Sequence, residues 1–120
     1  MIFPSLKRSV RSFRFAFRGI GILIRDENNA KIHLAITIAV TVAGWWFSIS
    51  AAEWIAVVIC IGLVWTAEAF NTALEGVCNH LWSGHDERAR NIKDISAAAV
   101  LLTALSAGIT GLIIFIPKLF

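Results

Sequence analysis

The stretch Trp54-Ile-Ala-Val-Val-Ile-Cys-Ile-Gly-Leu-Val-Trp-Thr-Ala67 is apolar almost throughout, and it continues without a break into Glu68-Ala-Phe-Asn-Thr-Ala-Leu-Glu75. The whole run extends to about Leu81 and is longer than the roughly 20 residues that a helix needs to cross a bilayer. It therefore predicts a transmembrane helix over residues 54–81 whose last turns project into water.

Two further apolar runs, residues 32–50 and 95–116, lie on either side of this helix and are predicted to cross the membrane as well. Hydrophobic residues make up 58% of the chain, and the mean hydropathy is +0.73, well above the values of soluble domains. Ser50 and Glu53 have the spacing of a capping box at the start of the second span. The chain is thus predicted to be a single all-α integral membrane domain over residues 1–120.

The segment before the first span has the periodicity of a helix with one apolar face, over about residues 5–25. Its apolar positions are Leu6, Val10, Phe13, Phe17, Ile20 and Ile24, and its basic positions include Lys7, Arg11, Arg14, Arg18 and Arg25. A basic amphipathic helix is expected to lie in the headgroup plane. A nucleic-acid-binding arm has the same charge pattern, but the rest of the chain requires a bilayer, so no nucleic acid partner is expected.

The distribution of positive charge predicts the orientation in the membrane. Seven of the 11 Lys and Arg residues lie at or before Lys31, and Arg88, Arg90 and Lys93 follow the second span, whereas the loop between the first two spans has none. Cytoplasmic segments carry the excess of positive charge. The N-terminus is therefore predicted to be cytoplasmic and the C-terminus to lie outside.

Within the second span, Glu68, Asn71 and Glu75 share one helix face, with Thr72 beside them and Asn79 further along. Ionisable groups are costly inside a bilayer and normally face a bundle interior or a wet cavity. The alternative is a polar stripe that only holds helices together. Two carboxylates on one face favour a functional site.

The residue types predict chemistry assisted by a cation at the inner membrane face. Glu27 and Glu75 are both placed at a membrane boundary and could together bind Mg²⁺. Glu68 lies deeper and suits a proton acceptor that Asn71 orients. Arg8, Arg14, Arg18 and Lys93 could neutralise phosphates. Neither a Walker loop nor an H-R-D loop occurs, which excludes the corresponding soluble nucleotide-binding folds.

Glu68-Ala-Phe-Asn71-Thr72-Ala-Leu-Glu75, Glu27 before the first span, and Lys93-Asp94 ahead of an Ala-rich helix together resemble the prokaryotic diacylglycerol kinase and undecaprenol kinase family. The resemblance covers nearly the whole chain. It implies a homotrimeric bundle in the bacterial inner membrane, with an N-terminal surface helix and three transmembrane helices per subunit. It also implies active sites shared between subunits, in which the γ-phosphoryl group of ATP passes to a lipid hydroxyl with the help of Mg²⁺.

Carried over by position, the resemblance makes Glu68 the catalytic base and Asn71 its supporting amide, with Glu27 and Glu75 as ligands of Mg²⁺. Contacts to ATP are implied for Arg8, Phe15, Glu27, Glu75, Asp86, Glu87, Lys93 and Asp94. The lipid substrate is expected to contact Phe13, Phe17, Ala30, His33 and Glu68. The chain departs from the family pattern at Asn79, where members usually carry Asp, and in the loop around Gly84.

Two other functions are compatible with the sequence. In a small oligomeric channel or proton-linked transporter, Glu68 and Glu75 would line a pore, but a pore does not require the polar loop of mixed charge or the Lys93-Asp94 pair. In a structural membrane subunit, the polar residues would only fix the register of the helices. For a kinase, the acceptor is undecaprenol or diacylglycerol, and the apolar lining by Phe13, Phe15 and Phe17 slightly favours undecaprenol.

Overall fold

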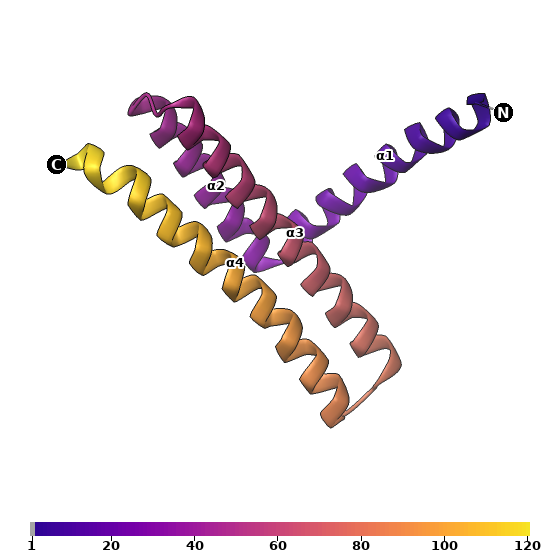
Figure 1. The fold of residues 1–120 in the computed structure, drawn as a ribbon. Helices are drawn as coiled ribbons and strands as arrows, with labels where there is room; N and C mark the ends of the chain where they lie inside the picture. Colours follow the sequence, from indigo (N-terminus) through magenta and orange to yellow (C-terminus); the bar gives the residue numbers. More distant parts are fainter. Residues whose placement is uncertain (1) are drawn as a thin grey trace.

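The computed structural model describes residues 2–120, with side chains from Ser5 onward. It contains four α-helices, α1 (Ile2–Asp26), α2 (Asn28–Trp46), α3 (Ala51–Leu81) and α4 (Glu87–Leu119). The all-helical fold is confirmed, since the described residues include no β-strand. Helix α3 packs against both α2 and α4, whereas α1 leaves this bundle at an angle and ends far from it (Figure 1).

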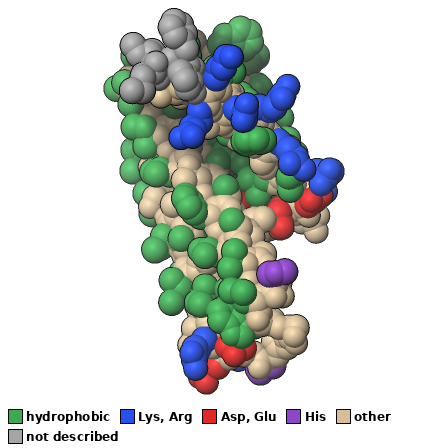
Figure 2. Space-filling view, turned by 90° about the vertical axis from the view of Figure 1, so that its right-hand side faces the viewer, with side chains coloured by type: hydrophobic (Ala, Val, Ile, Leu, Met, Phe, Trp, Pro, Cys, Tyr) green, Lys and Arg blue, Asp and Glu red, His purple; other side chains and the backbone are tan. Residues whose placement is uncertain are grey.

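Helix α1 covers the predicted surface helix and is attached to the bundle only near its C-terminal end. Leu23 is buried there, whereas the apolar and basic side chains from Leu6 to Arg18 are exposed. Basic side chains gather over α1 in the space-filling view (Figure 2). A helix that exposes an apolar and a basic face in this way suits the boundary between lipid and water.

The junction between α1 and α2 is a single residue. The predicted surface helix ends near residue 25 and the predicted first span begins at residue 32, but in the structure only Glu27 lies outside a helix, with φ −106° and ψ 122°. The backbone stays hydrogen-bonded across it, because the Glu27 N–H donates to Leu23 O and the Lys31 N–H donates to Glu27 O. Beside it, Arg25 Nε donates to Asp26 Oδ1 at 2.8 Å, and this hydrogen bond lowers the pKa of the Asp26 carboxyl.

The turn between α2 and α3 begins after Trp46, which is earlier than the predicted end of the first span at residue 50. Ser48 has a positive φ of 50°. The predicted capping box is confirmed, because Ser50 Oγ accepts from the Glu53 N–H at 3.1 Å and Glu53 Oε1 accepts from the Ser50 N–H at 2.9 Å. The turn is short, and α2 and α3 are therefore antiparallel neighbours, as expected.

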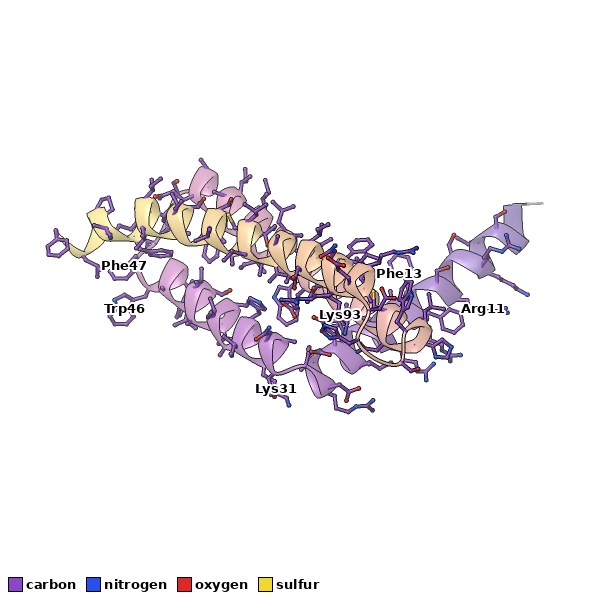
Figure 3. All side chains as sticks on the ribbon, turned by 90° about the horizontal axis from the view of Figure 1, so that it is seen from below. Arg11, Phe13, Lys31, Trp46, Phe47 and Lys93 are labelled. Carbon is purple, nitrogen blue, oxygen red and sulfur yellow. The ribbon has the colours of Figure 1, made fainter. Side chains whose placement is uncertain are left out.

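The end of the bundle at the turn between α2 and α3 holds a buried apolar cluster and an ion pair. Ile49, Val57 and Ile114 form the buried cluster there. The rings of Phe47 and Phe115 pack edge to face beside it, with centroids 6.2 Å apart. Figure 3 shows Trp46 and Phe47 at this end of α2, opposite Lys31. In addition, Lys118 Nζ lies 2.9 Å from Glu53 Oε2, which joins the end of α4 to the start of α3.

Helix α4 begins well before the apolar run from which it was predicted. Asp86 caps it, with Oδ1 accepting from the Arg88 N–H at 2.9 Å and the Ala89 N–H at 3.1 Å. Lys93 and Asp94 therefore lie within the first turns of the helix and not in a loop ahead of it. At its other end α4 continues past the predicted end at residue 116 to Leu119, with Pro117 in its last turn.

Two of the helices, α3 with 31 residues and α4 with 33, are long and apolar enough to cross a membrane. Helix α2 has 19 residues and begins with polar side chains, and it does not meet the same criteria of length and hydropathy for crossing a membrane. Most of the large apolar side chains on all four helices are exposed, and Figure 2 shows them along the face of the bundle. Such a surface requires lipid or other protein against it.

Gly44 permits the closest approach between α2 and the start of α3, and Gly44→Ala is expected to lower the free energy of unfolding by about 1–3 kcal/mol. A Cβ at this position would lie 2.8 Å from Trp54 Cη2 and 3.0 Å from Ile49 Cδ1. Unfolding in detergent micelles measures the effect. Gly19→Ala is the matched control, because a Cβ there meets nothing within 4 Å. An equal loss in both variants would contradict the role of the contact.

Candidate functional site

Glu68 is the most deeply buried charged side chain of the described residues. It lies in α3 with 1% of its surface exposed. Its Oε2 atom is 3.3 Å from His33 Nε2 on α2, but the two atoms do not form a hydrogen bond, and Oε2 has no other partner. The carboxylate is therefore buried beside an imidazole with part of its accepting capacity unused.

Two further side chains join α2 to α3 next to this pair. Trp65 Nε1 donates to Thr37 Oγ1 at 3.0 Å, and Thr37 Oγ1 donates to the His33 carbonyl at 2.7 Å. The rings of His33 and Trp65 meet edge to face with centroids 6.3 Å apart. His33 is thus level with Glu68, and Thr37, one turn along, is level with Trp65.

Asn71 and Glu75 form the next part of the stripe along α3. Asn71 is buried, with 7% exposed, and its Nδ2 donates to Glu75 Oε1 at 3.3 Å. The Asn71 Oδ1 and Thr72 Oγ1 atoms are buried without a partner. Buried polar atoms are normally hydrogen-bonded, so these two, with Glu68 Oε2, leave the stripe ready to bind further polar groups.

A separate polar pocket lies where α3 ends and α4 begins, with a volume of about 460 Å³. It includes Asp86, Lys93 and Asp94 from the sequence prediction. Its other lining residues are Cys78, Asn79, Trp82, Ser83, Gly84, His85, Ala89 and Arg90. Glu87 is exposed and does not line it. The pocket combines cations, carboxylates and an indole, which are groups that can contact phosphate, hydroxyl and a planar base.

The remaining predicted contacts are on α1 and at the start of α2. Arg8, Phe13, Phe15 and Phe17 are exposed on α1, and the structure does not bring them to Glu68 within one chain. Ala30 is fully buried, and Glu27 is half-buried at the helix junction. A single chain therefore brings together the stripe with His33, and separately the polar pocket, but not all the residues of the predicted site.

Glu27 and Glu75 suit Mg²⁺ in the chemistry of their ligand atoms. Mg²⁺ in nucleotide sites is held by one or two carboxylates together with phosphate oxygens and waters. The described side chains include no group of three or more His, Cys, Asp or Glu that could hold a metal by themselves. Glu75 is the better defined of the two carboxylates, because Asn71 fixes one of its oxygens.

Sequence reasoning missed the parts played by Thr37 and Trp65. Trp65 precedes Glu68 by three positions and Thr37 follows His33 by four, so each pair shares a helix face. Cys60 and Cys78 are free thiols, with Cys78 buried and Cys60 half-buried.

The sequence pattern described as Prokaryotic diacylglycerol kinase matches residues 14–115. The chain belongs to the prokaryotic diacylglycerol kinase family. Among its relatives is the undecaprenol kinase of Bacillus subtilis (strain 168), 37% identical over 114 residues that cover 95% of this chain and 93% of the relative. A diacylglycerol kinase of Synechocystis sp. is 33% identical, over 90% of this chain and 62% of the relative. The diacylglycerol kinase of Escherichia coli (strain K12) is 31% identical, over 86% and 84%.

Membership in the prokaryotic diacylglycerol kinase family confirms the resemblance found in the sequence. The matched residues include the stripe on α3, His33 on α2 and the polar pocket at the start of α4. The family and its relatives therefore make this protein a lipid kinase of the membrane.

Proposed function

We propose that this protein transfers the γ-phosphoryl group of ATP to a lipid alcohol at the cytoplasmic face of the membrane, with Glu68 as the general base. The proposal depends above all on one observation: a buried carboxylate with an unpaired oxygen, on a helix long enough to cross the membrane, in a family of lipid kinases. Glu68 would accept the proton of the lipid hydroxyl as its oxygen attacks the γ-phosphorus. Asn71 would help to position the reacting groups.

The antiparallel register of α2 and α3 supports a joint role for Glu27 and Glu75. His33 is level with Glu68, and continuing α2 toward its start by about two turns brings Glu27 to the level of Glu75. The two carboxylates would hold Mg²⁺, which neutralises charge on the β- and γ-phosphates when bound. Glu75 would keep its orientation through Asn71.

The polar pocket between α3 and α4 is the proposed place for part of the nucleotide. Lys93 and Arg90 would neutralise phosphate charge, and Asp86 and Asp94 would accept hydrogen bonds from hydroxyl or amino groups. Arg8, Phe15 and Glu87 are exposed in one chain, so their proposed contacts need a neighbouring subunit or a movement of α1.

A homotrimer with shared sites would supply the missing side chains. An apolar groove of about 460 Å³ runs between α2, α3 and α4, and the α4 wall carries Ala104, Ala107, Gly108 and Gly111. Small residues let helices approach closely in a membrane, which favours a helix of another subunit in this groove. In the same arrangement α2 would be the first of three spans, and the charge distribution would keep the N-terminus cytoplasmic.

The acceptor is proposed to be undecaprenol in preference to diacylglycerol. Both have a primary hydroxyl at headgroup depth, so Glu68 would serve either lipid, and selectivity must come from the surface that meets the lipid body. The side chains of Phe13, Phe15 and Phe17 offer no hydrogen bonds to ester carbonyls. The full-length B. subtilis relative is named an undecaprenol kinase, which agrees with this choice.

In micelles that contain both lipids at equal mole fraction, labelled phosphate from ATP is expected to appear mainly on undecaprenol. Thin-layer separation of the two products measures the ratio. A clear preference for diacylglycerol would reject the choice of acceptor and leave the kinase proposal standing. If neither lipid, nor any other lipid alcohol tested, were labelled, and liposomes with the protein conducted ions without ATP, the channel alternative would replace the kinase.

A further inference from the structure

His33 lies against the proposed base, a contact that its expected role in binding the lipid substrate does not explain. Its Nε2 atom approaches Glu68 Oε2 to 3.3 Å, while 16% of the imidazole side chain and 1% of the carboxylate side chain are exposed. The tautomer that carries a proton on Nε2 makes the imidazole a hydrogen-bond donor to this oxygen. His33 is the side chain that the structure places beside Glu68 Oε2.

The position of the imidazole is fixed by its own surroundings. The edge of the Trp65 ring packs directly against it, with the ring centroids 6.3 Å apart. The hydrogen bond from Thr37 goes to the backbone carbonyl of His33 and does not contact the ring. An imidazole packed against Trp65 in this way has little freedom to turn away from Glu68, and this packing is the support that a residue needs if it is to orient a catalytic group.

A glutamate needs such a residue more than most bases do. Its terminal torsion has broad, roughly two-fold minima, so an unsupported carboxylate can rotate its oxygens out of line with a substrate. Burial of the carboxylate also has a cost that a hydrogen-bond donor offsets. Asn71 does not supply this donor, because its Nδ2 is directed to Glu75.

We infer that His33 is a positioning residue, which donates from Nε2 to Glu68 Oε2 and so directs the other oxygen, Oε1, toward the hydroxyl of the lipid alcohol. This inference rests on the proposed function of Glu68. At 3.3 Å the two atoms do not form a hydrogen bond in the structure, but catalytic hydrogen bonds are often long or poorly aligned in a free enzyme and tighten when substrate completes the active site. His33 acts through Glu68 and has no covalent part in the transfer.

Two substitutions of His33 separate the donor from the volume of the side chain. His33→Leu fills the space without a donor and is expected to lower kcat on the order of tenfold to a hundredfold, because a misplaced group loses about that much. His33→Gln keeps an amide N–H near the place of Nε2 and is expected to recover most of the loss. The KM for Mg-ATP should stay unchanged in both variants, because residue 33 does not line the polar pocket proposed for the nucleotide.

Thr37→Val is the matched control. It removes the hydrogen bond from Trp65 that joins α2 to α3, while it keeps the size of the side chain and leaves His33 beside Glu68. If His33 only joined the helices, His33→Leu and Thr37→Val would reduce kcat by the same factor. We expect Thr37→Val to keep near wild-type kcat per folded protein.

A double-mutant cycle with Glu68→Gln tests whether the two residues act as a unit. Residues that act through one another give strongly non-additive losses. In the Glu68→Gln background, His33→Leu is therefore expected to cause no further loss of the residual rate. Full kcat in His33→Leu, the same loss in Thr37→Val, or additive losses in the cycle would each overturn the inference. The absence of phosphoryl transfer by the wild-type protein would instead overturn the proposed function.

Discussion

Glu68→Gln is expected to abolish phosphoryl transfer to the lipid, with a rate loss of about a hundredfold to ten-thousandfold. The amide keeps the volume and much of the hydrogen bonding of the carboxylate, but it cannot accept the proton of the lipid hydroxyl. Initial rates with labelled ATP and saturating lipid in micelles measure the loss. Size-exclusion chromatography of the same sample should give the oligomer of the wild-type protein.

Glu53→Gln provides the matched control, because it makes the same chemical change at the far end of the same helix. Glutamine also serves in a capping box, so the cap with Ser50 is retained, although the ion pair with Lys118 is lost. Its rate per folded protein should match the wild type. Near-full turnover of Glu68→Gln would show that another group accepts the proton.

Glu27→Gln and Glu75→Gln are each expected to raise the Mg²⁺ concentration needed for half-maximal rate by at least about tenfold. Each removes one of two carboxylates proposed to bind the same ion, so the double variant should lose much less than the product of the single losses. Titration of the rate with Mg²⁺ at fixed ATP measures all three variants. Strictly additive losses would indicate separate sites.

Asp26→Asn is the control for this pair. Asp26 is next to Glu27 in the chain, but it is exposed and hydrogen-bonded to Arg25. Removal of its charge should leave the Mg²⁺ concentration needed for half-maximal rate equal to that of the wild-type protein. A shift equal to that of Glu27→Gln would mean that the general negative charge of this segment, and not a specific ligand, attracts the cation.

The sequence predicted the helices and their order because these depend on local patterns. Apolar runs and the capping box at Ser50 are properties of neighbouring residues, and the structure places helices where they occur. The exact ends of the helices were harder to predict. Helix α4 starts at Glu87 because Asp86 caps it, although the charged residues that follow would suit a loop equally well by composition.

The contacts of the site could be predicted only in part. The stripe of Glu68, Asn71 and Glu75 follows from helical spacing alone. The contact between His33 and Glu68 does not, because α2 is apolar around its circumference, and no pattern says which of its faces meets α3. The placement of Arg8 and Phe15 depends on the angle of α1 and, in the proposed trimer, on neighbouring subunits, and neither follows from the pattern of neighbouring residues in the sequence.

The one-residue junction at Glu27 has a mechanical consequence. A backbone has two soft torsions per residue, and Glu27 is the one extended residue between α1 and α2. Any change in the tilt of the surface helix relative to the bundle must therefore turn the peptide that carries this carboxylate. The tilt of α1 relative to the bundle and the direction of the Glu27 side chain are therefore coupled. If α1 lies on the membrane surface as proposed, lipid packing and surface charge would act directly on the orientation of the carboxylate proposed to bind Mg²⁺.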